Sequence, residues 1–330
     1  MTSTRLFLHE LRLAGDEAML LPVAATGLRS ATFLDGRENF SAGQAQFAGA
    51  AQFLAGQPAT ADARFIFHIG FCGSTLLSRL LDVPGATLVL REPHCLANIV
   101  NQPLDEATLQ SVLPPVIAHL SQPWAANERV VIKPSNWANA LLGRIVRPSS
   151  RAVFMTDSRQ RFLTAVLRGG QDRVAFTARL AARLGGDDPE LGALVGLAAA
   201  APDADRQLAR LVLVAHEIQL RRFRDAASTL PADRRAWVSA AALDHDPMAV
   251  LGQASAALDL ALAPEQLAAN VERWSKSHAK DPGRAFSPSN EASANAAVAA
   301  RFGALIADTL DWAGDALGPE PREPSSETSR

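Results

Sequence analysis

The chain has 330 residues, of which 48% are hydrophobic and 20% are charged, a balance typical of a soluble globular protein with a large core. Its formal net charge of −2 argues against a nucleic-acid or anionic-membrane partner, so any basic site must be local. No apolar run is long enough to cross a bilayer, and Glu10 stands where a signal peptide needs its apolar core. The two cysteines, Cys72 and Cys95, are too few for a disulfide framework. We therefore expect a cytoplasmic protein that is neither exported nor anchored.

Residues 1–60 predict an N-terminal extension that is rich in β-structure and ends in a helix. Alternating apolar residues and turn signals predict three short strands, around Leu6–Leu11, in Ala18–Val23 and in Ser30–Leu34. A helix is predicted for Gly43–Leu54, which carries apolar residues on one face. No chemistry is assigned to this extension.

Strand-like and helical patterns alternate from residue 64 to about residue 170. The predicted strands are Phe65–Ile69, Ala86–Leu90, Arg129–Ile132 and Arg151–Met155. Strands separated by helices pair in parallel with right-handed crossovers, and such sheets bind ligands at the carboxyl ends of the strands. The polar residues expected to meet at that edge are Gly73, Glu92, Lys133 and Asp157.

The remaining chain is predicted to complete one α/β domain that spans residues 61–318. The helix expected between Leu104 and Leu120 is interrupted at Pro114-Pro115, and residues 172–228 predict two or three further helices. Arg235–Ser239 is a candidate fifth strand. The tail, residues 319–330, is rich in proline, serine and charge and is expected to be disordered.

The stretch Phe65–Asp82 predicts a strand, a tight glycine turn and the start of a helix. Gly70 and Gly73 allow the backbone to approach a bound group, and the free N–H groups at the start of the helix favour a phosphate. The same pattern also fits an ordinary turn with Ser74 or Thr75 as the helix cap. It differs from the nucleoside-triphosphatase loop because no lysine follows Gly73.

Two further residues are candidates for catalysis. Glu92 follows the second predicted strand and has the chemistry of a general base beside a bound phosphate or phosphosulfate; its alternative role is a pair with Arg91 or a solvated loop acid. Lys133 follows the third strand, where its ammonium would stabilise charge on the transferring group, or would lie at the rim of the sheet as an ordinary surface lysine. His68 is expected to be a packed core residue, and no metal-binding pattern is predicted.

The loop and the lysine segment resemble those of sulfotransferases. Phe67-His-Ile-Gly-Phe-Cys-Gly-Ser-Thr-Leu-Leu77 is similar to the family's 5′-phosphosulfate loop, an apolar run followed by Gly-x-x-Arg-Ser-Gly-Thr-Thr-Leu-Leu. In that register Cys72 stands on the family's serine and Phe71 on its basic residue, which is a departure. Val131-Ile-Lys-Pro-Ser-Asn136 is similar to the Lys-Asp-Pro or Lys-Thr-Pro segment of tyrosylprotein-type and bacterial sulfotransferases.

Phe154–Thr164 resembles the family's 3′-phosphate segment, apolar-apolar-Arg-Asp-Pro-Arg with a serine eight residues after the first arginine. Asp157 and Arg159 match, and Thr164 supplies the hydroxyl, but Thr156 replaces the first arginine. A capped helix with solvated arginines explains most of this segment without a ligand.

A basic cluster, Trp274–Phe286, loosely resembles the loop that closes over the nucleotide in sulfotransferases, with Gly283-Arg284 as a candidate phosphate clamp and Trp274 or Phe286 as a candidate adenine stack. An ordinary basic surface loop fits equally well. Arg79, Arg159, Arg161 or this cluster are the candidates to replace the positive charge missing at Phe71 and Thr156.

The resemblance, over residues 64–286, implies a P-loop-type parallel sheet flanked by helices and sulfuryl transfer from 3′-phosphoadenosine 5′-phosphosulfate (PAPS) to a hydroxyl or amine of a small-molecule or peptide acceptor. Glu92 and Lys133 would be catalytic, and no metal would be required. The implied donor-binding residues are Gly70, Cys72, Gly73, Ser74, Thr75, Leu76, Arg159, Thr164 and Arg284. Two alternatives stay open, a phosphotransferase that uses ATP and Mg²⁺, and a non-catalytic binding protein with degenerate donor contacts. The sequence does not indicate the oligomeric state.

Overall fold

The computed structural model describes residues 4–58, 62–275, 277–285 and 287–320. Its strands are β1 (Arg5–Arg12), β2 (Glu17–Val23), β3 (Gln46–Ala48), β4 (Arg64–His68), β5 (Thr87–Arg91), β6 (Arg129–Lys133), β7 (Arg151–Thr156), β8 (Arg235–Ser239), β9 (Ser277–His278) and β10 (Asp281–Ala285). The helices before residue 170 are α1 (Ala25–Ser30), α2 (Ala50–Ala55), α3 (Ser74–Leu80), α4 (His94–Val100), α5 (Glu106–Leu120), α6 (Leu142–Ile145) and α7 (Arg159–Arg168). The later helices are α8 (Gly170–Gly185), α9 (Pro189–Ala199), α10 (Ala204–Ser228), α11 (Ala240–His245), α12 (Pro247–Leu258), α13 (Pro264–Ser275) and α14 (Pro288–Leu317). Three short 3₁₀ turns are η1 (Leu13–Gly15), η2 (Asn136–Leu141) and η3 (Ala232–Arg234).

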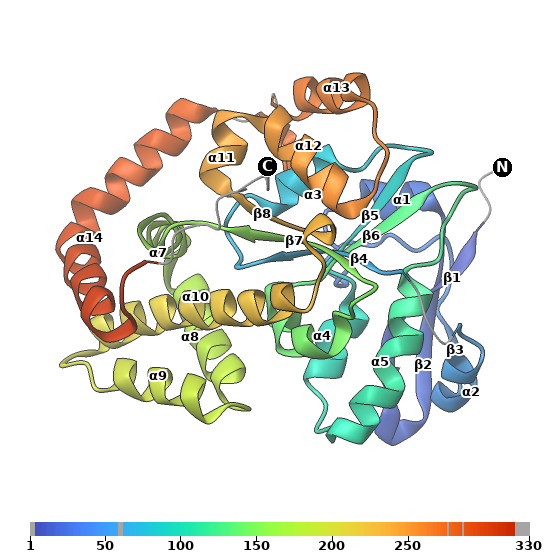
Figure 1. The fold of residues 1–330 in the computed structure, drawn as a ribbon, viewed down its shortest axis with the longest axis horizontal. Coiled ribbons are helices and arrows are strands. Elements are labelled where there is room, and N and C mark those ends of the chain that lie inside the picture. Colours follow the sequence, from blue (N-terminus) through green and yellow to red (C-terminus); the bar gives the residue numbers. More distant parts are fainter. Residues whose placement is uncertain (1–3, 59–61, 276, 286, 321–330) are drawn as a thin grey trace.

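A five-stranded parallel sheet forms the centre of the molecule, in the order β5-β6-β4-β7-β8 (Figure 1). Every residue of β4 and β5 is buried, which explains their uninterrupted apolar runs. The chain passes from β4 to one side of the sheet for β5 and β6, and then to the other side for β7 and β8. The switch in strand order therefore lies at the end of β4, where ligands bind in sheets of this kind. This architecture confirms the predicted α/β class.

The N-terminal part forms a small antiparallel sheet, β1-β2-β3, as its β-rich pattern predicts. The strand predicted for Ser30–Leu34 is wrong. The fully buried guanidinium of Arg91 donates two hydrogen bonds to the Ala31 carbonyl, and Leu34 donates its N–H to the Arg91 carbonyl. The segment is thus bound to the end of β5 instead of pairing as a strand. The helix predicted for Gly43–Leu54 is replaced by β3 and the shorter α2.

The predicted interruption of α5 is also wrong, because Pro114 and Pro115 lie inside one continuous helix. The buried face of α5, which includes Leu113, Val116 and Ile117, holds the helix against the core despite the two missing N–H donors.

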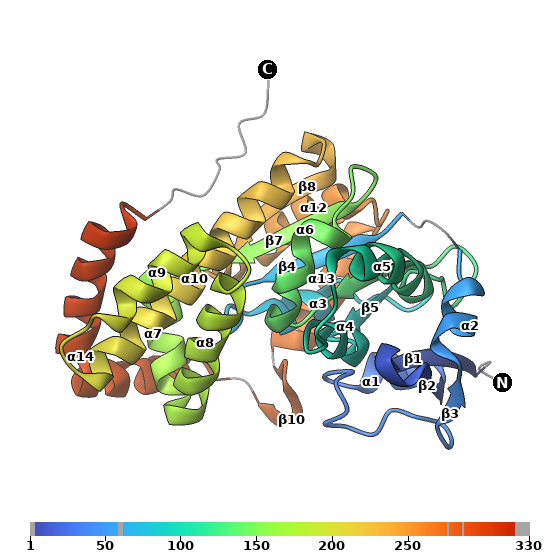
Figure 2. The same cartoon turned by 90° about the horizontal axis from the view of Figure 1, so that it is seen from below.

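The large helical part lies at the opposite end of the sheet from β1 and β2 (Figure 2). Helix α10 packs against α8, α9 and α14, and α14 also packs against α7. None of the helices in the described ranges combines the length and the apolar character that a membrane span requires. Residues 321–330 of the predicted tail lie outside the described residues.

Candidate functional site

The glycine turn after β4 has a backbone that few sequences could adopt. Gly70, Phe71 and Gly73 have positive φ angles of 86°, 55° and 79°. At Gly70 a Cβ atom would lie 2.7 Å from Nδ2 of Asn136, so the residue must be glycine for reasons of both conformation and space. Helix α3 begins directly after Gly73, and no described side chain caps it. Its first N–H groups therefore lack the usual side-chain acceptor.

Three polar side chains meet beside this turn, at the ends of adjacent strands. Lys133, at the end of β6, has no exposed surface, and its Nζ lies 2.7 Å from Oε1 of Glu92 and 3.0 Å from Nε2 of His68. Glu92 directly follows β5, and its side chain is 15% exposed. The carboxylate is thus the part of this cluster that an acceptor can reach. We refer to His68, Glu92 and Lys133 as the strand-end cluster.

His68 is neutral and its tautomer is fixed by its neighbours. The Gly70 N–H donates to Nδ1, so the proton lies on Nε2 and is donated to the Pro134 carbonyl at 3.0 Å. Burial and the nearby Lys133 ammonium hold the pKa of His68 well below its usual range. His68 is therefore the packed, hydrogen-bonded residue predicted from the sequence, and it also ties the glycine turn to the segment after Lys133.

Glu92 adopts a left-handed backbone, with a φ of 58°, which is uncommon for a residue with a long side chain. Its N–H donates to the Lys133 carbonyl at 2.7 Å, which continues the β5-β6 pairing by one residue. This conformation costs about 1–2 kcal/mol, and backbone strain of this kind is found mainly where the placement of a side chain is functionally important.

Two cations from outside the loop lie beside the ring of Phe71. The guanidinium of Arg173, in α8, lies 4.6 Å from the centre of the Phe71 ring, and Nζ of Lys280, in the turn between β9 and β10, lies 5.7 Å from it. Both distances are within the range of a cation–π contact. Desolvation and repulsion by Lys133 lower the pKa of Lys280, which places its ammonium within the field of the strand-end cluster.

Arg79 and Arg161, two of the arginines predicted to replace the cation missing from the loop, do not lie beside Phe71 and bind other partners. Arg79 is buried and donates to the Arg29 carbonyl at 2.7 Å. Arg161 pairs with Asp157 and Asp244 on the surface side of α7. Lys280 belongs to the basic cluster predicted from the sequence, whereas Arg173 carries no local signal that would have distinguished it from the other arginines.

Cys72, Ser74 and Thr75 are buried in the loop and first helical turn, and Leu76 is half-buried. Burial raises the pKa of the Cys72 thiol to about 11, so it stays protonated at neutral pH. Cys72 is thus an inert small residue at this position.

The predicted 3′-phosphate segment is occupied by residues of the chain itself. Arg159, at the start of α7, is buried and pairs with Glu217 of α10 at 3.1 Å, and its Nη1 donates to the Gly318 carbonyl. Its backbone N–H donates to Oε1 of Glu320 at 2.5 Å. A carboxylate therefore sits at the helix N-terminus where an anion is favoured. Thr164 lies half-buried further along α7.

The C-terminal basic cluster is only partly described. Arg284 lies in β10, but its side chain is outside the described residues. Trp274 is 9% exposed and packs under the guanidinium of Arg79, at 5.1 Å. The buried indole is thus engaged by its own chain, so its prediction as an open adenine platform is not supported by this arrangement.

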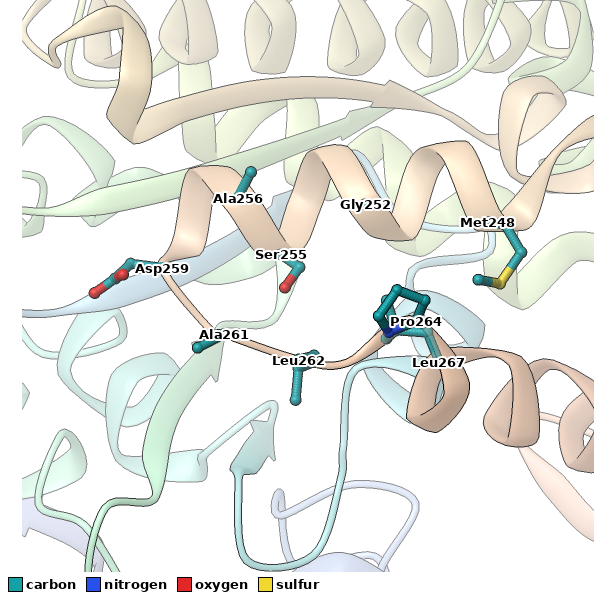
Figure 3. A pocket seen from close by; sticks show the side chains of 9 residues that line it. All are labelled: Met248, Gly252, Ser255, Ala256, Asp259, Ala261, Leu262, Pro264 and Leu267. Atoms are coloured by element: carbon teal, nitrogen blue, oxygen red, sulfur yellow. The ribbon is translucent and has the colours of Figure 1, made fainter.

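A separate pocket of about 380 Å³ lies between α12 and α13 (Figure 3). Met248 and Leu267 border one end, and Asp259 lies at the other, pointing away. None of the predicted site residues lines it, so we assign it no part in the reaction.

No family model matches the chain, and no curated protein is significantly similar to it in sequence. Two similar solved structures are a sulfotransferase domain from the curacin biosynthetic pathway and a sulfotransferase from Alicyclobacillus acidocaldarius. The first is 14% identical with a TM-score of 0.39, covering 74% of this chain and 98% of the other. The second is 14% identical with a TM-score of 0.35, covering 75% and 96%. Similarity this remote assigns neither a reaction nor site residues.

Proposed function

We propose that the chain transfers a sulfuryl group from PAPS to a hydroxyl or amine of a small-molecule or peptide acceptor. The observation that carries this proposal is the strand-end cluster, in which a fully buried Lys133 lies 2.7 Å from Glu92 beside an uncapped glycine turn. A buried ammonium held by a single carboxylate at a strand end has the chemistry needed to stabilise a leaving oxygen, next to a base. The match of the loop and the Lys-Pro segment to sulfotransferase motifs supports the same reaction.

In this reaction the acceptor oxygen or nitrogen attacks the sulfur of the donor, and the bond between the sulfur and the bridging phosphate oxygen breaks. The acceptor proton passes to the carboxylate of Glu92. Lys133 stabilises the negative charge that develops on the bridging oxygen. The products are the sulfated acceptor and 3′-phosphoadenosine 5′-phosphate, so atoms and charge balance.

The donor's phosphosulfate would lie against the glycine turn, in the residues Gly70, Cys72, Gly73, Ser74, Thr75 and Leu76. Arg173 and Lys280 would supply the charge that the family places at the position of Phe71, because both cations lie within 6 Å of its ring centre. Arg159 and Thr164 would face the 3′-phosphate only after the Glu320 carboxylate leaves the start of α7. Arg284 stays a candidate clamp.

Donor class is tested by calorimetric titration with 3′-phosphoadenosine 5′-phosphate and, separately, with ATP and Mg²⁺. We expect the bisphosphate alone to bind wild type. Arg173→Ala and Lys280→Ala should each weaken it about tenfold, since a charge-assisted contact contributes about 1.5–3 kcal/mol. Arg179→Ala, an exposed arginine on the same helix as Arg173, is the matched control and should bind like wild type.

Binding of ATP with Mg²⁺ alone would instead indicate a phosphotransferase, and silence with both ligands would indicate a non-catalytic protein. Chemistry is tested by following sulfuryl transfer from PAPS to a panel of phenols, alcohols and amines. Glu92→Gln should keep bisphosphate binding and lose at least about a hundredfold in rate, the usual contribution of a general base. A Glu92→Gln variant as fast as wild type would exclude Glu92 as the base.

A further inference from the structure

Two histidines and a carboxylate meet on the N-terminal face of the molecule, outside the site described above. His9 and Glu10 are neighbours on β1, and His94 is the first residue of α4. One ligand atom from each residue lies within 4.8 Å of those of the other two. The Nε2 atom of His94 lies 3.4 Å from Oε1 of Glu10, and the two imidazole rings have their centres 4.9 Å apart.

These separations match those of ligands that share one metal ion. Ligand atoms about 2.1 Å from a tetrahedral Zn²⁺ lie about 3.4 Å from one another, and two bound imidazoles place their ring centres about 5 Å apart. The 3.4 Å between Nε2 of His94 and Oε1 of Glu10 matches this spacing, and the ligand atom of His9, within 4.8 Å of both, would move closer to share the ion.

His9 has a polar atom that the described chain leaves unused. Its residue is 7% exposed, and its Nδ1 is buried without a hydrogen-bond partner in the described chain. Such atoms are rare, because leaving one unpaired costs about 1–3 kcal/mol. A ring nitrogen of this kind can give its lone pair to a metal ion.

The carboxylate is already oriented for the same purpose. Nη2 of Arg12 donates to Oε2 of Glu10 at 2.5 Å, which leaves Oε1 on the side of His94. Outer partners of this kind commonly orient metal ligands. His94 and Glu10 keep 30% and 19% of their side-chain surface exposed, so an ion can enter from solvent.

We propose that His9, Glu10 and His94 bind a divalent transition-metal ion of the zinc class, with one coordination position left for water. Two imidazoles and one carboxylate suit such a metal better than Mg²⁺ or Ca²⁺, which prefer all-oxygen sites. The ion would join β1 to the start of α4, two residues after Glu92. This ties the N-terminal extension to the strand end that carries the proposed base, and it does not depend on the proposed reaction.

The test is calorimetric titration of tag-free, chelator-treated full-length protein with Zn²⁺, at neutral pH. We expect one Zn²⁺ per chain, at least tenfold weaker binding by His94→Ala and by Glu10→Gln, and unchanged binding by His245→Ala, an exposed histidine elsewhere. Both ligand variants alter partly exposed side chains, so they are expected to fold, which the far-ultraviolet circular dichroism of each checks.

X-ray absorption of the zinc-loaded protein should give imidazole nitrogen and carboxylate oxygen ligands at about 2.0–2.2 Å. Failure of wild type to bind one equivalent of Zn²⁺, or equal binding by wild type and both ligand variants, would overturn the proposal. Loss of binding in His245→Ala would do the same, because that residue lies outside the proposed site.

Discussion

The ion pair between Lys133 and Glu92 offers the sharpest test of the site's structure. Lys133→Met keeps the length of the side chain and removes its charge, which leaves the Glu92 carboxylate with Arg37, at 3.9 Å, in place of the ammonium at 2.7 Å. At 2.7 Å, and with an effective dielectric constant of about 20, the direct attraction is about 6 kcal/mol. Part of this attraction offsets the desolvation of the two groups.

We therefore expect Lys133→Met to lower the free energy of unfolding by about 3 kcal/mol, near the lower end for a broken buried pair, because Glu92 retains 15% exposure and can gain water. Glu92→Gln should cost less than a buried lysine left wholly unpaired would normally cost, because the amide oxygen of the glutamine can still accept a hydrogen bond from the Lys133 ammonium. The double variant, Lys133→Met with Glu92→Gln, should recover about 2 kcal/mol relative to the sum of the single variants.

Urea denaturation of the four proteins at pH 7.5, followed by circular dichroism, measures this coupling. A coupling free energy below about 0.5 kcal/mol would refute the reasoning, because contacting charges removed from water cannot be independent of each other. A large cost in both singles with no recovery in the double variant would show that each residue contributes through packing and not through the pair.

Three further predictions use other parts of the fold. Gly70→Ala would place a Cβ 2.7 Å from Nδ2 of Asn136, whereas at Gly85, which has a similar φ of 81°, an added Cβ meets no atom within 4 Å. Gly70→Ala should therefore lower the free energy of unfolding by about 2 kcal/mol more than Gly85→Ala, as measured by urea denaturation. Equal losses in the two variants would contradict the packing of the glycine turn. Burial lowers the pKa of His119 to about 4, so between pH 4 and pH 6.5 the unfolded chain binds one proton more than the folded chain. Stability should therefore fall as the pH drops through this window, by up to about 3 kcal/mol from His119, and an equally steep pH profile in His119→Gln would exclude it as the cause. Glu320→Gln removes the carboxylate at the start of α7 and should tighten binding of 3′-phosphoadenosine 5′-phosphate about fivefold by calorimetry, whereas weaker binding would mean that the carboxylate does not compete with the ligand.

The central sheet was predictable because its signals are local. Each strand from β4 to β8 is a short apolar run bounded by polar or turn residues, and parallel pairing follows from the helices between them. The errors in the extension have a different origin. Ser30–Leu34 has the apolar pattern of a strand, but the buried Arg91, about 60 positions away, donates two hydrogen bonds to the Ala31 carbonyl. The sequence of the segment itself does not indicate that contact.

The same distinction separates the parts of the site that were predicted from those that were not. Glu92 and Lys133 were expected to meet because both follow strands of one sheet, and they lie 2.7 Å apart. Arg173 belongs to a helix that the strand-end argument does not reach, and Glu320 lies beyond the predicted domain. His9 and His94 are separated by 85 positions, which is not a sequence spacing typical of a metal site. Their 4.9 Å ring contact could therefore not be predicted from the sequence.

The charges around the glycine turn explain why a phenylalanine can stand where sulfotransferases have a basic residue. Lys133, Arg173 and Lys280 bring positive charge to the turn, and Glu92 brings negative charge, in a chain whose net charge is −2. His68 adds none, because it is neutral. Burial, and after it repulsion by Lys133, lower the pKa of Lys280, so a bound anion nearby would stabilise its charged form. In the proposed function, Arg173 and Lys280, which lie against the ring of Phe71, would replace the cation missing from the loop and would favour an anionic ligand.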